Sequence, residues 1–524
     1  MRRTLAAAVA AGLALSIAPA SVLHASSSSA EDRAATSGRE AGQAARPEAA
    51  LAALTRAEQL LGTGPSLTAR RRTPLDPDEV TLALRDLFVA LPALEGEERK
   101  RANGVLARPT DNADDPYGDG YPAKAKTRRQ CEGHFCLHWV REGKDAPPGA
   151  GWRKKTLQTM NQVWKREVDQ LGYRPPLKDG RRGGDSTFDV YLKDLGSRGF
   201  YGYCAPERRK PGSKWRASGY CVLDNDFSRE QYHARPIEAL RVTAAHEFFH
   251  AIQFGYDYGE DPWFMEATAT WIEERFADGV NDNRQYLPFG QLADPATPLD
   301  THRESGFNQY GNWPFFEFLS SHFGPKIVRT IWNKAATFPG APDHYSVDAV
   351  AAALGRYGGL PGVLAAYSGA NTAPALSYAE GRHWPKAPPA RRWTLGSGNA
   401  RRAARVTIDH LAARSALVLP GETLGGRRWR LRIDVDVPVA RTGPAVYVLV
   451  QRRNAAPIRR LVRLEGRQGR TTVGFSAREV RSVTVTLVNA STRYRCWVKA
   501  RFSCQGEPRD DGRPFRLRVR AFKR

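Results

Sequence analysis

The chain has 524 residues, of which 41% are hydrophobic and 26% are charged. This composition can build packed cores, so it excludes a wholly disordered protein, and the length predicts two or three domains. The 79 Lys and Arg residues exceed the 55 Asp and Glu residues, which gives a net charge of +24. The basic residues are spread along the chain without interleaved aromatic residues, and this distribution disfavours nucleic acid as the partner.

The first twenty residues predict a secretory signal peptide. Arg2 and Arg3 precede an apolar stretch over residues 5–17, and an A-x-A cleavage pattern ends at residue 20. Residues 21–46, rich in Ser and Ala, predict a disordered leader. No later stretch has the ~18 consecutive apolar residues of a transmembrane helix. We therefore expect a secreted, extracellular protein without a membrane span.

The cysteines predict three local disulfides, because an exported protein holds its thiols in an oxidising compartment. Three pairs are close in sequence: Cys131 with Cys136, Cys204 with Cys221, and Cys496 with Cys504. Short separations favour nearest-neighbour bridges. A metal site is the alternative for the first pair, since His134 and His138 stand beside it, although no second ligand pair follows at zinc-finger spacing.

Residues 47–130 predict helices followed by a linker. Apolar residues repeat at helical spacing within 47–106, and Asp76-Pro77 is an N-cap followed by proline at the first helical position. Residues 109–130, with aspartates, glycines and prolines, predict the linker. The run of arginines at 70–72 predicts an exposed loop that a processing protease could cut. The segment is thus either a removable pro-region or a helical hairpin packed permanently on the next domain.

The pattern changes near residue 391. Short alternating or β-branched segments separated by turn residues predict an antiparallel β-sandwich over 391–524. Nothing in it assembles a nucleophile with a base. We expect this domain to bind carbohydrate or a cell surface, or to stabilise the domain before it.

The chemistry is expected in the segment 236–254, PIEALRVTAAHEFFHAIQF, which predicts a buried helix opened by Pro236 and closed by Gly255. It contains the pattern H-E-x-x-H as His246, Glu247 and His250. Histidines four residues apart project from one helical face and can bind one Zn²⁺ ion, while the glutamate beside them can act on water. Two buried histidines and a carboxylate would be costly without a metal.

The third ligand decides the class of zinc site. The metzincin pattern requires glycine and histidine where Gln253 and Tyr256 stand, and is excluded. A second helix is predicted from Asp261-Pro262 to Phe276, with Glu266 in an apolar stretch. Asp257 is the alternative ligand, on a loop after the first helix. We favour Glu266, because a glutamate from a following helix is the common third ligand.

HEFFHAIQFGYD followed by WFMEATATWIEE resembles the gluzincins, zinc metallopeptidases with a glutamate ligand on the next helix. More closely, the chain resembles a set of secreted bacterial metalloproteases over roughly residues 80–390, through CEGHFCLHWV (131–140), FDVYLKDLG (188–196), YGYC (201–204), QYGNWPFFEFLSSHFG (309–324) and ANTAPALSYAEGRHWP (370–385). The resemblance implies an α+β, zincin-like metallopeptidase domain at 131–390, with His246, His250 and Glu266 as zinc ligands and Glu247 as general base.

Two positions depart from the gluzincin pattern. Ala267 replaces a common glycine, and Thr270 stands where thermolysin-like enzymes have an aspartate. The residues that orient the zinc ligands are therefore expected elsewhere, at Glu273 or Glu274.

The ligand set predicts a secreted zinc-dependent endopeptidase that acts on protein or peptide substrates. Tyr310 and His302 are the candidate donors to the tetrahedral oxyanion, Tyr310 because Gly311 would leave space in front of its ring. The strand expected at 188–192 would pair with the substrate backbone. The alternative is a non-catalytic binding protein with a degenerate zinc site that works through its C-terminal domain, and the retained Glu247 argues against it.

Overall fold

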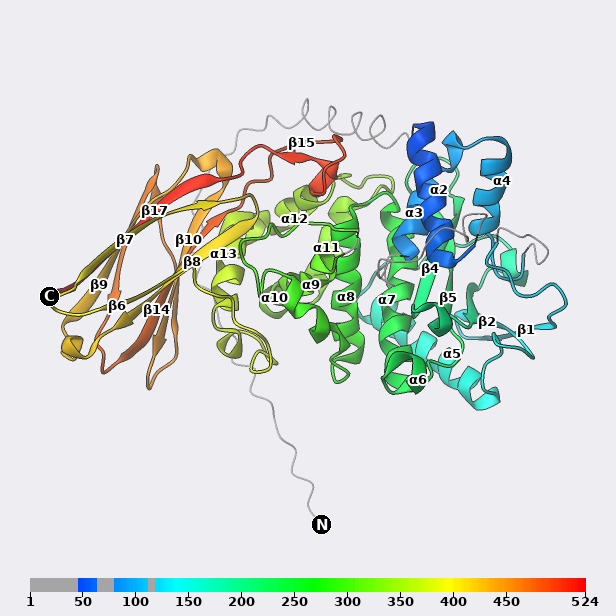
Figure 1. Cartoon of the computed structure of the whole chain (residues 1–524), viewed down its shortest axis with the longest axis horizontal. Helices are drawn as coiled ribbons and strands as arrows, with labels where there is room; N and C mark the ends of the chain where they lie inside the picture. Colours follow the sequence, from blue (N-terminus) through cyan, green and yellow to red (C-terminus); the bar gives the residue numbers. More distant parts are fainter. Residues whose placement is uncertain (1–45, 64–79, 112–117, 305) are drawn as a thin grey trace, which may run out of the picture.

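The structure is a computed structural model that describes residues 46–63, 80–111, 118–304 and 306–524. The predicted signal peptide, the leader up to residue 45, the arginine run at 70–72 and Asp76-Pro77 lie outside these residues. Along the long axis of the molecule, a sheet with its helices, a central group of helices and a pair of sheets follow one another (Figure 1). The fold is therefore mixed, in agreement with the α+β class.

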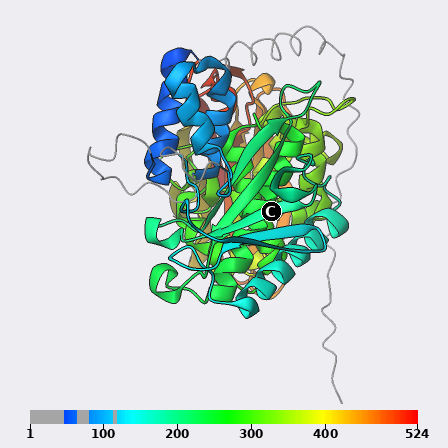
Figure 2. The same ribbon diagram turned by 90° about the vertical axis from the view of Figure 1, so that its right-hand side faces the viewer.

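Three helices precede the first sheet: α2 (Pro47–Leu61), α3 (Val80–Ala90) and α4 (Gly96–Val105). They lie along one side of the sheet (Figure 2). Nine of the eleven residues of α3 are buried, so this helix packs into the core of the domain.

The predicted linker at 109–130 is wrong in its second half. Its last residues belong to strand β1 (Thr127–Glu132). Tyr121 is only 2% exposed, and its hydroxyl donates to the carbonyl oxygens of His138 and Leu192 at 3.2 and 2.7 Å. An aromatic ring in the core ties down a segment whose composition alone predicts a flexible connection.

The first sheet has the strand order β1-β2-β3-β5-β4. It contains β1, β2 (Phe135–Val140), β3 (Phe188–Lys193), β5 (Ala217–Asp224) and β4 (Gly202–Arg209). Strands β2, β3 and β5 run parallel, and β1 and β4 are antiparallel edges. Because β2 and β5 occupy both sides of β3, the prediction that residues 188–192 pair with a substrate is wrong.

Helix α7 (Pro236–Asp257) crosses β4 and β5 and is followed at once by α8 (Pro262–Ala277). The predicted end of α7 at residue 254, with Gly255 as the C-cap, is three residues too early. The carbonyl oxygen of Gly255 accepts from Arg216 Nε at 2.7 Å, and the helix continues as a buried element to Asp257. Tertiary contacts thus override the local tendency of glycine to end a helix.

The central helices are α9 (Asn308–Gly311), α10 (Trp313–Phe323), α11 (Lys326–Ala335), α12 (Val347–Leu354) and α13 (Gly359–Asn371), with α5 (Ala150–Trp164) and α6 (Arg229–Tyr232) beside the first sheet. Within the described residues, no single helix is both long and apolar enough to cross a membrane. One bent pair, Val347–Tyr357 with Gly359–Asn371, meets the criterion only when its two parts are taken together.

Two five-stranded sheets form a sandwich around an apolar core. The inner sheet has β11 (Ile458–Leu461), β10 (Pro444–Arg452), β14 (Val480–Asn489), β8 (Ala412–Pro420) and β6 (Arg391–Leu395). The outer sheet has β12 (Leu464–Glu465), β13 (Gln468–Gly474), β9 (Trp429–Asp436), β17 (Arg513–Lys523) and β7 (Arg401–Ile408). The expectation of a purely antiparallel sandwich is wrong at β6, which pairs parallel with β8 because it enters the sheet directly from the helical region.

The sandwich is packed onto the helices. Its inner sheet lies against α13, and Tyr447 and Leu449 of β10 join the same apolar core as the helical region. A loop that contains the short strands β15 (Tyr494–Arg495) and β16 (Glu507–Pro508) reaches back over the helices.

The structure pairs the cysteines as their spacing predicts, in three disulfides: Cys131–Cys136, Cys204–Cys221 and Cys496–Cys504. The alternative of a metal at the first pair is wrong, because both sulfurs are bonded to each other. The neighbouring His138 bonds Asp189 at 2.6 Å instead. Three disulfides are compatible with an oxidising, extracellular compartment.

Candidate metal centre

Helices α7 and α8 bring His246, His250 and Glu266 together. His246 Nε2 lies 3.2 Å from Glu266 Oε2, and His250 Nε2 lies 3.5 Å from Glu266 Oε1. One potential ligand atom from each residue falls within 4.8 Å of the others. The i, i+4 spacing on α7 places both rings on one face, and the short connection to α8 sets the carboxylate against them.

Both imidazoles are oriented from behind by hydrogen bonds at Nδ1. His246 Nδ1 bonds Glu273 Oε1 and His250 Nδ1 bonds Gln253 Oε1, each at 2.7 Å. Since both oxygens are acceptors, each Nδ1 carries a proton, and each Nε2 is the nitrogen that faces Glu266 and would bind a metal.

Of the two residues expected to orient the ligands, Glu273 does so and Glu274 does not. Glu274 accepts from Asn283 Nδ2 at 2.9 Å instead. Gln253 was not among the candidates. Its spacing of three residues from His250 on the same helix is the signal in the sequence that points to it.

The polar atoms of His250 and Glu266 at the centre of this cluster contact few other polar groups. His250 and Glu266 are fully buried, and apart from the contacts between the imidazoles and the carboxylate, His250 Nε2 and both oxygens of Glu266 have no hydrogen-bond partner among the described residues. Burial opposes ionisation of Glu266, but the two imidazoles outweigh it and lower the pKa of this carboxyl to about 2. Two nitrogen donors and one ionised carboxylate fit Zn²⁺, which takes three protein ligands in catalytic sites and leaves a position open.

Glu247 lies beside the metal ligands and is held by a residue from a distant part of the chain. Thr81 Oγ1, on α3, donates to Glu247 Oε2 at 2.9 Å, and the backbone N–H of Cys204 donates to Thr81 Oγ1 at 3.0 Å. Burial raises the pKa of Glu247. A Cβ on Gly202 would come within 3.0 Å of the Glu247 side chain, so the edge strand β4 presses closely on this carboxylate.

Asp257 lies apart from the cluster. It is the last residue of α7, is fully buried, and its Oδ1 accepts from the N–H of Gly259 at 2.8 Å. The structure therefore brings Glu266, and not Asp257, to the two histidines.

Of the two candidate oxyanion donors, Tyr310 has a ring contact with the cluster. The ring of Tyr310, on α9, is buried with its centroid 6.3 Å from that of His246. Burial lowers the pKa of His302 to about 4, and its Nε2 is a buried atom without a hydrogen-bond partner. The expectation that Gly311 leaves space before the Tyr310 ring is wrong, because a Cβ there would meet the backbone of Gly290 and Tyr286.

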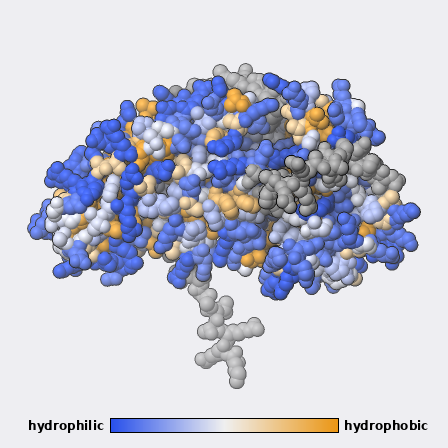
Figure 3. All heavy atoms as spheres, in the orientation of Figure 1, coloured by the Kyte–Doolittle hydropathy of each residue, from blue (hydrophilic) through white to orange (hydrophobic). Residues whose placement is uncertain are grey.

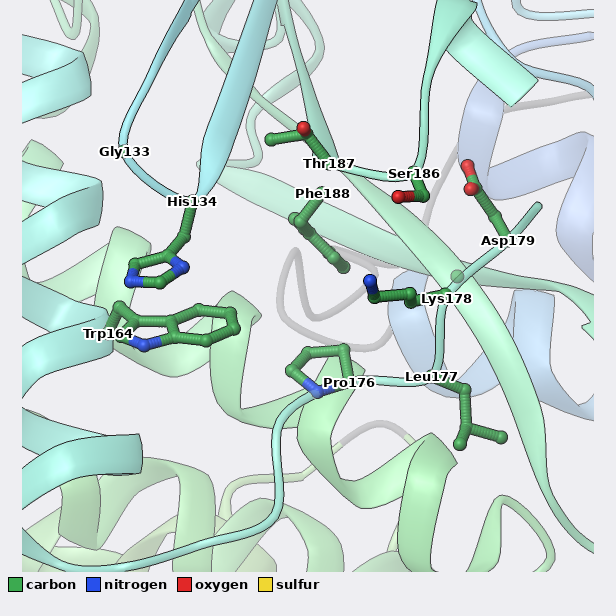
Figure 4. Close-up of a pocket in the computed structure, with 11 residues that line it drawn as sticks. Gly133, His134, Trp164, Pro176, Leu177, Lys178, Asp179, Ser186, Thr187 and Phe188 are labelled. Carbon is green, nitrogen blue, oxygen red and sulfur yellow. The ribbon is translucent and has the colours of Figure 1, made fainter. Parts of the chain in front are cut away.

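A concavity of about 200 Å³ lies near the turn between β1 and β2 (Figure 4). His134 stacks on Trp164 at one side of it, with ring centroids 3.9 Å apart, and Lys178 and Phe188 line another side. This stacking accounts for the position of the His134 ring without a bound metal.

No protein-family profile matches the chain, and no curated protein matches it. Among solved structures, the pre-peptidase C-terminal domain of collagenase from Bacillus anthracis is similar over 26% of this chain and 97% of that chain, with 4% identity and a TM-score of 0.16. CorA, a surface-associated copper-binding protein of Methylomicrobium album BG8, is similar over 26% of this chain and 100% of that chain, with 10% identity and a TM-score of 0.15. At these TM-scores the similarities carry no argument about fold or function.

Proposed function

We propose that this protein is a secreted, zinc-dependent endopeptidase of the gluzincin type with a zincin-like catalytic domain. The observation that carries the proposal is the convergence of the buried His246, His250 and Glu266, one ligand atom from each within 4.8 Å of the others, beside a separate carboxylate at Glu247. A purely structural zinc site has no need of that fourth residue. This difference favours an enzyme over a binding protein with a degenerate site.

Each residue has a defined part in the proposed reaction. His246, His250 and Glu266 would hold Zn²⁺, and bound zinc would act as a Lewis acid toward a peptide carbonyl and acidify water. Glu247 takes the proton from the attacking water and returns it to the leaving amine. Glu273 and Gln253 fix the imidazole rings, and Tyr310 or His302 donates to the oxyanion.

The substitution Glu247→Gln tests this assignment. We expect the variant to lose hydrolysis of an unstructured protein such as casein while it retains about one zinc ion per chain, because Glu247 handles the water and not the metal. Glu238→Gln is the matched control, since Glu238 lies on the same helix but pairs with Arg235 at 2.8 Å. Unchanged activity in Glu247→Gln, or loss of its zinc, would overturn the assignment.

A further inference from the structure

The outer sheet of the sandwich, with β7, β9 and β17, forms one end of the long axis of the molecule, away from α7 and α8 (Figure 1). Many of the residues visible at this end are hydrophilic (Figure 3). Alternation along the strands turns Leu517 and Val519 into the core and the residues between and beside them outward. The outward arginines are Arg401 and Arg405 on β7, Arg516, Arg518 and Arg520 on β17, Arg430 and Arg432 on β9, and Arg470 on β13. We call this set the arginine face.

Several of these arginines are directly opposite one another in the strand register. Arg516 pairs with Arg405, and Arg520 pairs with Arg401 on one side and Arg432 on the other. Like charges placed directly opposite each other destabilise a sheet. Folding alone would favour other residues at these positions, so the arrangement points to a partner that supplies negative charge.

The carboxylates on the face do not neutralise it. Asp434 accepts from Arg432 and Arg470, and Asp436 pairs with Arg518 at 2.9 Å. This leaves the four exposed arginines Arg401, Arg405, Arg516 and Arg520, whose side chains form no ion pair with a carboxylate among the described residues. Asp436 lies opposite Arg516 in the register, but its carboxylate pairs with Arg518. We call these four arginines the free quartet.

The geometry points to a linear, ring-free phosphodiester polymer as the ligand. The quartet sits on two neighbouring strands, about 4.8 Å apart, with side chains repeating about every 6.8 Å along β17, which suits a chain with closely repeated anionic groups. A guanidinium fork matches the oxygens of phosphate and of carboxylate groups in two-pronged hydrogen bonds, and the face carries no lysine.

The composition of the face also distinguishes among polyanions. Phe522 is the aromatic residue that turns outward on β17, and it is half-buried at the end of the face. Nucleic acid bases and sugar rings bind on rows of aromatic platforms. We therefore propose that the arginine face binds an extended phosphodiester-linked polyol, such as a cell-envelope polymer, and this proposal does not depend on the proposed catalytic function.

The test uses the full-length chain and fluorescence anisotropy with a labelled poly(glycerol phosphate) chain. We expect binding that weakens steeply between about 50 and 200 mM salt. Replacing the free quartet with glutamine should weaken binding at least about tenfold and reduce the salt slope by about 3, because each lost contact removes about 0.7 from the slope for a single strand. The same variant should melt at an unchanged or higher temperature, since like-charge pairs are removed.

A matched variant replaces four exposed arginines of the inner sheet with glutamine, namely Arg391, Arg392, Arg414 and Arg481. It removes the same net charge and should bind like the unmodified protein. Absence of binding at low salt, or an equal loss in both variants, would overturn the proposal. Tighter binding of an oligothymidylate or of a polyuronate of equal charge would also overturn it, by assigning the face to nucleic acid or to an acidic sugar polymer.

Discussion

Tyr310 carries a proposed role that depends on a single hydroxyl. Its ring is buried beside that of His246. If it donates to the oxyanion, Tyr310→Phe should lower kcat by about a hundredfold with little change in KM or zinc content, since that hydrogen bond forms in the transition state. His302→Ala should then cost much less. Normal turnover in Tyr310→Phe, or an inactive His302→Ala enzyme that still holds zinc, would transfer the role to the histidine.

The residues of the metal centre differ in how far the sequence predicts them. His246, Glu247 and His250 follow from a helical spacing that is visible in five consecutive residues. Glu266 follows from a carboxylate in an apolar helix. Thr81 could not be found this way, because it lies 166 residues from Glu247 and meets it through the packing of α3 on β4.

Helix α3 supplies a hydrogen bond to the candidate metal centre that its sequence does not predict. Thr81 donates to Glu247, and Arg85 of the same helix, which is 4% exposed, donates to the carbonyl oxygen of Glu260 at 2.6 Å. A helix with these contacts is built into the domain, and because it follows the arginine run at 70–72, cleavage at that run would leave it in place.

The hydroxyl of Thr81 can be tested by a pair of substitutions. Thr81→Val keeps the shape of the side chain but removes the donor, and we expect kcat to fall about tenfold with zinc content unchanged, as for the loss of a hydrogen bond to a charged group. Thr81→Ser should retain most of the activity. If both variants lose activity equally, or if Thr81→Val turns over normally, the hydroxyl does not position Glu247.

The order of strands in the first sheet could not be predicted from the sequence. The predicted starts of α7 and α8 are confirmed, because proline at the first helical position is a local signal in the sequence. The position of β3 at the centre of the sheet depends on pairing between strands far apart in sequence, and a single strand pattern does not contain it.

Across the whole molecule, a buried histidine joins the sandwich to the helical region. His410 Nε2 bonds Asp300 at 3.0 Å and His410 Nδ1 bonds Asp511 at 2.6 Å, while the hydroxyl of Tyr494 donates to Asp300 at 2.8 Å. These hydrogen bonds connect the helical region to the sandwich through buried side chains.

From the contacts of His410 we predict that the free energy of unfolding falls at alkaline pH. Burial lowers the pKa of His410, but Asp300 and Asp511 outweigh it and raise the pKa from its ordinary value near 6.5 to about 9. A raised pKa in the folded state means that the stabilisation is complete below about pH 6.5 and is lost as pH rises through about 9, a change of about 3 kcal/mol.

Urea unfolding at several pH values measures this effect. His410→Gln should lower the free energy of unfolding at neutral pH and flatten its decline toward alkaline pH. The exposed His233→Gln serves as the control and should leave the profile unchanged. An identical pH profile in His410→Gln and the unmodified protein would show that the histidine does not carry the charge assigned to it.

The most direct test of the central claim is anomalous X-ray scattering at the zinc edge from crystals of the purified protein. We predict a single strong peak between α7 and α8, within about 2.0 to 2.2 Å of His246 Nε2, His250 Nε2 and a carboxylate oxygen of Glu266. A peak bonded instead to Asp257 or to the acidic group Glu274, Asp278 and Glu380, or no peak in crystals grown with zinc, would contradict the account.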